Sequence, residues 1–81
     1  MSLSQEQIEF SRDMTKTYIV NKLTQDFKLL PEKALVKFMK TKTYELLQSD
    51  KSSLYTESFE FVYTLLTYEL NDDWDNWYNF R

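Results

Sequence analysis

The sequence predicts an all-α fold, a small single-domain bundle of about four helices followed by a short C-terminal tail. The 81 residues include no glycine and one proline, whereas tight β-hairpins rely on residues that tolerate positive φ angles. Apolar side chains also recur at helical spacing along most of the chain. With 42% hydrophobic residues, a chain of this length can bury one small core but not a second one.

The first helix is expected over residues 4–27. Ser4 and Gln7 have the spacing of a capping box. The helix is expected to end before Pro31, because the residue that precedes a proline is pushed out of the α region. The apolar positions form two series at helical spacing, Phe10–Met14–Tyr18 and Ile19–Leu23–Phe27.

Two shorter helices are expected over residues 31–40 and 42–49. Pro31 suits the first turn of a helix, and the charge of Glu32 is favourable near its N-terminus. The threonines at positions 41 and 43 compete for helix hydrogen bonds, so we expect a break between the two helices. The pattern alone leaves open whether they are continuous.

A fourth helix is expected over residues 53–70. Ser52 or Ser53 can cap it, with Glu57 in or near its first turns. Asn71 is expected to adopt the left-handed conformation that often closes a helix. The apolar stripe comprises Tyr55, Phe59, Val62 and Leu66, widened by Phe61, Leu65 and Tyr68.

Residues 71–81 form an acidic, aromatic tail that contains both tryptophans of the chain. If Asp72 or Asp73 caps a further turn, the large rings of this segment share one face. The favoured interpretation is a lid that covers the open end of the bundle, since burying each tryptophan is worth roughly 2–3 kcal/mol. The alternative is a docking surface, whose candidate interface residues are Trp74, Trp77, Tyr78, Asp73 and Asp75.

Catalytic chemistry is not expected. Histidine and cysteine are both absent, which excludes Ser/His and Cys/His nucleophilic sites as well as disulfides and Cys/His zinc sites. Phosphate-binding loops that need glycine are excluded too. Glu57 and Glu60 form a possible carboxylate pair, which we interpret as part of a solvated helix face. We therefore expect a protein that is not an enzyme and binds no cofactor.

Metal and membrane binding are not expected either. Asn71, Asp73 and Asp75 resemble the start of a calcium loop, but Asn76 stands at the sixth position, where that loop needs glycine. No apolar run is long enough for a membrane span, and no basic stretch followed by an apolar one suggests a cleaved signal peptide. A cytoplasmic location is the resulting expectation.

Charge is distributed unevenly along the chain. Residues 1–40 carry a formal charge of +2 and residues 41–81 a charge of −5. A candidate basic patch comprises Lys33, Lys37 and Lys40, which recur at i, i+4 and i+7, with Lys28 and Lys42 nearby. A solvated helix face is the favoured interpretation, and the alternative is contact with nucleic acid or an acidic partner. A pI near 4.8 argues against nucleic acid as the main ligand.

Several short motifs together resemble a family of small uncharacterised bacterial helical proteins, a domain of unknown function with an SKTYxLL-like segment. They are Ala34, Phe38, the run TKTYELL over 41–47, Leu54-Tyr55, Glu57-Ser58 and Glu69-Leu70. Thr41 replaces the serine of that segment and keeps its hydroxyl. The resemblance implies a compact helical domain and a bacterial source, and it transfers no catalytic residue. Family members near toxin-like genes further imply an antitoxin-like or accessory binding protein.

The segment Thr41-Lys42-Thr43-Tyr44 has two interpretations. The favoured one is structural: a threonine hydroxyl caps the third helix while Tyr44 and Leu47 pack inward. The alternative is a recognition loop that presents Lys42 and two hydroxyls to a ligand.

These observations favour a non-enzymatic helical module that acts through protein–protein interaction. Its partner is expected to be another protein, as for an antitoxin-like or accessory binding protein, or a second copy in a homodimer. The alternative hypothesis is a small nucleic-acid-associated regulator that uses Lys33, Lys37, Lys40 and Lys42.

Overall fold

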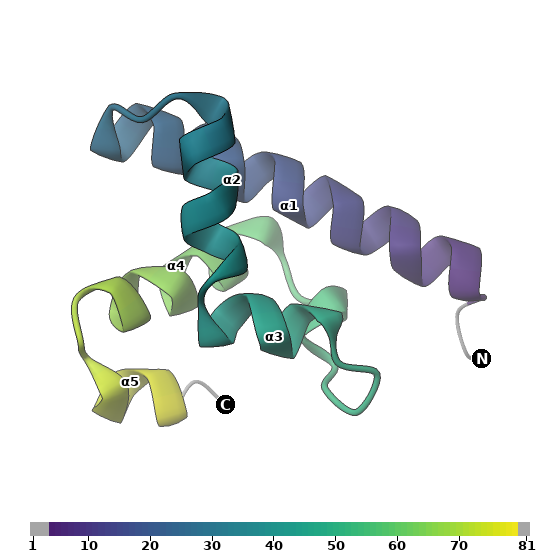
Figure 1. Ribbon diagram of the computed structural model, residues 1–81. Coiled ribbons are helices and arrows are strands. Elements are labelled where there is room, and N and C mark those ends of the chain that lie inside the picture. The colour runs from purple at the N-terminus through teal and green to yellow at the C-terminus, as the bar shows by residue number, and fades with distance from the viewer. Residues whose placement is uncertain (1–3, 80–81) are drawn as a thin grey trace.

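The computed structural model describes residues 4–79, which form five α-helices and one 3₁₀ turn and contain no strand (Figure 1). The all-α prediction is therefore confirmed. The elements are α1 (Gln5–Phe27), α2 (Pro31–Met39), α3 (Lys42–Gln48), the 3₁₀ turn η1 (Leu54–Thr56), α4 (Phe59–Leu70) and α5 (Trp74–Tyr78).

Helix α1 begins and ends as the sequence predicts. The backbone N–H of Gln7 donates to Ser4 Oγ at 3.2 Å, and the backbone N–H of Ser4 donates to Gln7 Oε1 at 2.9 Å, which completes a capping box. The helix closes at Lys28, whose φ of 57° lies in the left-handed region. Because the chain has no glycine, a residue with a side chain must take this conformation, at a cost of roughly 1–2 kcal/mol.

The predicted break between α2 and α3 is also confirmed. Pro31 occupies the first turn of α2, and Thr41 lies between the two helices as the N-cap of α3. Its hydroxyl accepts the backbone N–H of Tyr44 at 3.1 Å and donates to the carbonyl of Phe38 at 2.6 Å. One threonine therefore satisfies backbone groups of both helices, and each helix ends one residue earlier than expected.

The predicted fourth helix is wrong at its start. Helix α4 begins at Phe59 rather than near residue 53, because the hydroxyl of Ser58 caps it by accepting the backbone N–H of Phe61 at 3.1 Å. The preceding residues form η1, where the carbonyl of Tyr55 accepts the hydroxyl of Ser11 at 2.7 Å. This bond holds η1 against α1 as a separate turn.

The end of α4 differs in one detail. Asn71 has a φ of −97°, and Asp72 instead takes the left-handed conformation with a φ of 57°. Asp73 then caps α5, as predicted, because its carboxylate accepts the backbone N–H of Asn76 at 3.5 Å. Aspartate tolerates the left-handed region better than most residues because its short polar side chain can bond locally.

All five helices contribute to one hydrophobic core, which lies beside the C-terminal half of α1 (Figure 1). Helices α2 and α4 pack directly on α1, α3 packs on α2 and α4, and α5 packs on α4. Figure 1 shows the N-terminal end of α1 extending past the other helices. The buried apolar residues are Ile19, Leu23, Ala34, Phe38, Leu47, Leu54, Val62, Leu65, Leu66 and Trp77.

One apolar series of α1 faces solvent instead of the core. Phe10 and Met14, expected to share a stripe with Tyr18, are exposed. The buried side of the helix is made by Arg12, Thr15, Ile19 and Leu23. The helical spacing of the series was predicted correctly, whereas its direction relative to the core was left undetermined by the sequence.

A buried arginine joins α1 to the end of α3. Arg12 is 6% exposed, and its Nε donates to the carbonyl of Leu47 at 2.7 Å. Its Nη2 lies 3.1 Å from Oδ1 of Asp50, and its guanidinium lies 5.0 Å from the centre of the Tyr55 ring. Arg12 thus satisfies a carbonyl that the last turn of α3 leaves without a helical partner.

A tyrosine joins the other end of α1 to α4. The hydroxyl of Tyr63 donates to Oδ2 of Asp26, and Lys22 Nζ lies 5.5 Å from the centre of the Tyr63 ring. Burial and the hydrogen bond to Asp26 raise the pKa of Tyr63 well above its usual range. The hydroxyl therefore stays protonated, and this contact persists at neutral and moderately alkaline pH.

We expect the Arg12→Met variant to lower the free energy of unfolding by about 2 kcal/mol, because the buried carbonyl of Leu47 loses its partner. The Asp50→Asn variant should lower it by less than about 0.5 kcal/mol, since the Asp50 side chain is 81% exposed and exposed ion pairs contribute little. Urea unfolding measures both values. Equal losses for the two variants would show that the ion pair, rather than the bond to the carbonyl, is the stabilising contact.

Candidate functional site

The aromatic tail packs against the rest of the chain through Trp77. This residue is 6% exposed, and its Nε1 donates to Thr43 Oγ1 at 2.9 Å. The Trp77 ring centre lies 5.4 Å from that of Trp74 and 5.1 Å from that of Tyr78, so the three rings lie on one face as expected. The lid interpretation therefore describes Trp77, which is not accessible as a docking anchor.

The other candidate interface residues of the tail are less enclosed. Trp74 and Asp73 are half-buried, while Asp75 and Tyr78 are exposed. Asp73 accepts two bonds from Asn76, one from its backbone and one from its side chain. Of these candidate interface residues, Tyr78 and Asp75 are thus the exposed ones.

The segment Thr41–Tyr44 is committed to internal contacts. Thr41 and Thr43 are buried, and the two Thr41 bonds join α2 to α3. Thr43 Oγ1 donates to Oε1 of Glu69 at 2.7 Å while it accepts the bond from Trp77. Neither hydroxyl is available to a ligand, which leaves the Lys42 side chain as the exposed part of the proposed recognition loop.

Glu69 is the acceptor that completes this arrangement. Its Oε1 also accepts the backbone N–H of Thr43 at 2.9 Å, and its Oε2 accepts the backbone N–H of Lys42 at 2.7 Å. These donors are the first two N–H groups of α3, which have no partner within that helix. A carboxylate at this end is also favoured by the helix dipole. The chain Glu69–Thr43–Trp77 therefore holds α3, α4 and α5 together.

Sequence reasoning did not identify the roles of Glu69 and Arg12. Glu69 lies 26 residues from Thr43 in the chain, and Arg12 lies 35 residues from Leu47. Helical spacing relates only residues within one helix, so no local pattern connects these partners. The available signal was that each charged residue falls at the helical spacing of the apolar side of its helix, where a charge needs a partner.

The basic patch is solvent-exposed as a whole. Lys33, Lys37 and Lys40 all lie on the outer side of α2. Lys37 Nζ lies 5.5 Å from the centre of the Phe27 ring. Within residues 4–79, neither Lys33 nor Lys40 forms an ion pair.

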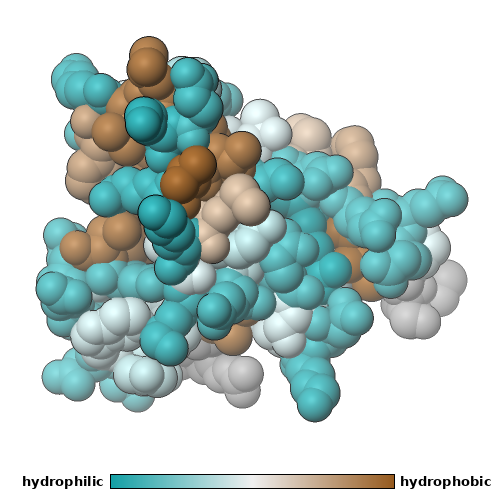
Figure 2. All heavy atoms as spheres, in the orientation of Figure 1, coloured by the Kyte–Doolittle hydropathy of each residue, from teal (hydrophilic) through white to brown (hydrophobic). Residues whose placement is uncertain are grey.

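The same helix exposes apolar side chains beside these lysines. Val36 and Met39 each remain 48% exposed, and Leu30, immediately before α2, remains 63% exposed. Figure 2 shows hydrophobic side chains gathered over α2 and the connection before it, with hydrophilic side chains among them.

An open groove of about 300 Å³ runs between α1 and α2 next to this apolar surface. Val20 of α1 and Pro31 and Leu35 of α2 provide its apolar lining, and Lys16, Thr17, Asn21 and Glu32 provide its polar lining. We define the α1–α2 docking face as the apolar residues Val20, Pro31, Leu35, Val36 and Met39.

The positive charge of the protein is concentrated around this face. Residues 28–42 contain five lysines and one glutamate, a formal charge of +4, against five basic and twelve acidic residues, −7, in the rest of the chain. Helix α2 with its flanks is thus a basic and apolar surface on an otherwise acidic molecule.

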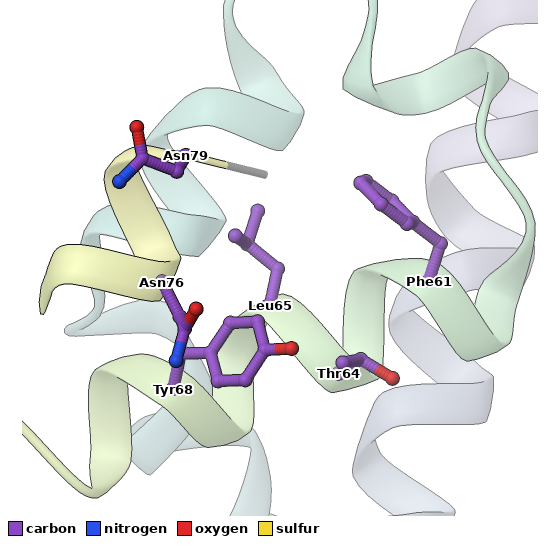
Figure 3. A pocket seen from close by; sticks show the side chains of 6 residues that line it. All are labelled: Phe61, Thr64, Leu65, Tyr68, Asn76 and Asn79. Atoms are coloured by element: carbon purple, nitrogen blue, oxygen red, sulfur yellow. The ribbon is translucent and has the colours of Figure 1, made fainter. Parts of the chain in front are cut away.

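Two other hollows among the described residues have different linings. A cavity of about 290 Å³ lies between α4 and α5. Figure 3 shows Phe61, Leu65 and Tyr68 of α4 around it, with Asn76 of α5 and Asn79, which follows α5. Among the described residues of its lining, Tyr68 is the one that is titratable.

A second hollow, of about 370 Å³, is lined by charged residues of α1 and by α3. Glu9 and Asp13 are exposed on α1, Lys16 lies 3.8 Å from Asp13, and Arg12 is already bound to Leu47 and Asp50. This arrangement is a solvated charged surface rather than a preorganised site.

The predicted carboxylate pair is likewise exposed, with Glu57 before α4 and Glu60 in its first turn. Within residues 4–79, no group of three Asp or Glu side chains is placed to hold a metal ion. None of the helices in that part of the chain is long and apolar enough to cross a membrane.

Comparison with protein-family models, curated proteins and solved structures finds no match to this chain. The resemblance to a bacterial family therefore stays a prediction from the motifs themselves.

We expect the Glu69→Gln variant to lower the free energy of unfolding by about 2 kcal/mol, because an amide replaces one acceptor oxygen with a donor. Hydrogen exchange at the Lys42 and Thr43 amides should become faster at the same time. The exposed Glu57→Gln variant is the matched control and should change stability by less than about 0.5 kcal/mol. Unchanged exchange at these two amides would contradict the capping role of Glu69.

The two tryptophans can be distinguished by fluorescence in single variants. Trp74→Phe leaves Trp77 as the one emitter, and we expect blue-shifted emission and weak quenching by acrylamide because this ring is buried. Trp77→Phe leaves the half-buried Trp74, which should emit at longer wavelength and be quenched more strongly. Equal quenching in the two variants would contradict the packed position of α5.

Proposed function

We propose that this chain is a bacterial, non-enzymatic helical module that acts by binding another protein, as an antitoxin-like or accessory binding protein does. The observation that carries the proposal is the α1–α2 docking face, where Val36 and Met39 stay half exposed beside an open groove. Exposed apolar surface next to a concave region is typical of protein contact sites. The proposal keeps the cytoplasmic location expected from the sequence.

The packing of the tail supports this choice of surface. Trp77 was the strongest sequence candidate for a binding anchor, but it is buried among residues of its own chain. The large apolar side chains that remain accessible on α2 and before it are Leu30, Val36 and Met39. A partner that covers them removes apolar area from water, at roughly 25 cal/mol per Å².

Nucleic-acid binding is the second candidate, because Lys33, Lys37, Lys40 and Lys42 are all exposed. A helix-turn-helix protein presents the N-terminal residues of its second helix to the bases. If α2 and α3 acted as such a motif, α3 would be the second helix. Its N-terminus is bound by the carboxylate of Glu69, which places negative charge where phosphates would approach. The formal charge of −3 for the whole chain disfavours phosphate contact further.

Size-exclusion chromatography with light scattering tests the protein-binding proposal on the full chain mixed with the product of the neighbouring gene. We expect co-elution of the two proteins, and loss of co-elution with Val36→Asp, which places a charge in the apolar face. Phe10→Asp is the matched control, because Phe10 is also exposed but lies on α1 away from the groove.

Failure to co-elute with any candidate partner, together with a monomeric mass, would contradict protein binding. A shift of a DNA or RNA probe at low salt that weakens as salt is added would instead support the second candidate.

A further inference from the structure

The outer side of α2 carries two neighbouring rows of different chemistry. With 3.6 residues per turn, residues three and four apart lie beside each other. One row is apolar and runs from Leu35 to Met39. The next row contains Val36 between Lys33, one turn earlier, and Lys40, one turn later. The strongest exposed positive charges thus directly border the apolar side chains.

The groove continues the apolar row toward α1. Val20 and Leu35 are half-buried in its lining, so they lie deeper than the exposed Val36 and Met39. Lys16 stands on the α1 side of the groove. The surface is therefore a shallow channel with an apolar lining that also includes Glu32. Lys33 and Lys40 lie beyond one of its edges, and Lys16, which pairs with Asp13, lies at the other.

We propose that the α1–α2 docking face takes an amphipathic helix of a partner protein whose apolar stripe is flanked by acidic residues. This inference rests on the proposed function and adds the chemistry of the partner. Apolar side chains at i, i+3 or i+4 and i+7 of the bound helix would enter the channel, which is how helices occupy grooves in other proteins. Acidic residues on one side of that stripe would reach Lys33 and Lys40, whereas Lys16 on the other side already lies 3.8 Å from Asp13.

Charge complementarity favours this occupant over a second copy of the chain. Two copies that met through α2 would bring two segments of formal charge +4 together. A head-to-tail contact between α2 and the acidic half of another copy is heterologous and generates an open assembly unless its rotation closes. An acidic amphipathic helix satisfies both the apolar row and the lysines in a one-to-one complex.

The same surface is poorly suited to a bilayer or to nucleic acid. A flat membrane cannot reach Val20 and Leu35 in the groove, and phosphates gain nothing from the apolar row. An acidic helix would contact only the basic segment, whereas an extended bilayer surface or a phosphate backbone would also face the acidic remainder of the chain, whose formal charge is −7.

The test uses two matched synthetic helical peptides of about 15 residues, near the length at which isolated helices become stable. Both carry leucines at i, i+3, i+4 and i+7, and the flanking positions are glutamate in one peptide and lysine in the other. Binding to the full chain is measured by calorimetry, and amide chemical shifts locate the contact. We expect the acidic peptide to bind about tenfold more tightly, from the difference of two or three ion pairs, with shifts in α2 and near Lys16 and Val20.

Two variants separate the apolar from the electrostatic contribution. Val36→Asp should lower the affinity for the acidic peptide about tenfold or more, whereas Phe10→Asp should leave this affinity unchanged. The double variant Lys33→Glu with Lys40→Glu should reverse the preference between the two peptides, while Lys51→Glu, an exposed lysine outside the face, should not. Addition of salt should reduce the preference in the unmodified chain.

Several results would overturn the inference: equal affinity for the two peptides, no binding of either, shifts centred on Phe10 and Met14, or tighter binding to phosphatidylserine-containing vesicles or to a DNA duplex. Its failure is distinguishable from failure of the proposed function. If a natural partner co-elutes equally well with Val36→Asp and with the double lysine variant, protein binding stands while this face and this partner chemistry are excluded.

Discussion

The positions of α3 and α5 depend on one carboxylate of α4. Glu69 near the end of α4 accepts two backbone N–H groups and one hydroxyl at the start of α3, and that hydroxyl in turn accepts the indole of Trp77. Hydrogen bonds that a charged group accepts are shorter and stronger than those between neutral groups. In a protein that can bury only one small core, this series of hydrogen bonds sets where α3 and α5 lie.

The same contacts decide which surfaces remain for binding. Because Trp77 and both threonines of the 41–44 segment face inward, two of the three sequence candidates are largely used for stability. Helix α2, by contrast, keeps an exposed side. Its Ala34 and Phe38 reach the core, while Val36, Met39 and the lysines face solvent. Val36 and Met39 of the docking face are therefore among the apolar side chains that remain accessible after the small core has been filled.

Charge and shape act together on α2. Lysines on a helix are usually solvated, and single exposed apolar residues are common on any protein. On α2 the lysines and the apolar residues matter for binding because they lie next to each other. Lys33 and Lys40 stand one turn on either side of Val36, and the groove to α1 begins at Leu35. The acidic remainder of the molecule sharpens this contrast, and it makes an acidic, apolar partner the complement that satisfies both features.

The sequence by itself determined the fold class and the capping box of α1, and it indicated a break at Thr41 and a turn capped by Asp72 or Asp73, because each depends on residues within a few positions of one another. It misplaced the start of α4, where Ser58 rather than Ser52 or Ser53 provides the cap, since three serines offered equivalent local signals. It also left the direction of the Phe10 series undetermined, because periodicity identifies a face without identifying what covers it. Only the tertiary structure decided the partners of Arg12 and Glu69, the burial of Trp77 and the joining of α1 and α2 into one face. These features depend on contacts between residues far apart in the chain, and local spacing carries no information about such contacts.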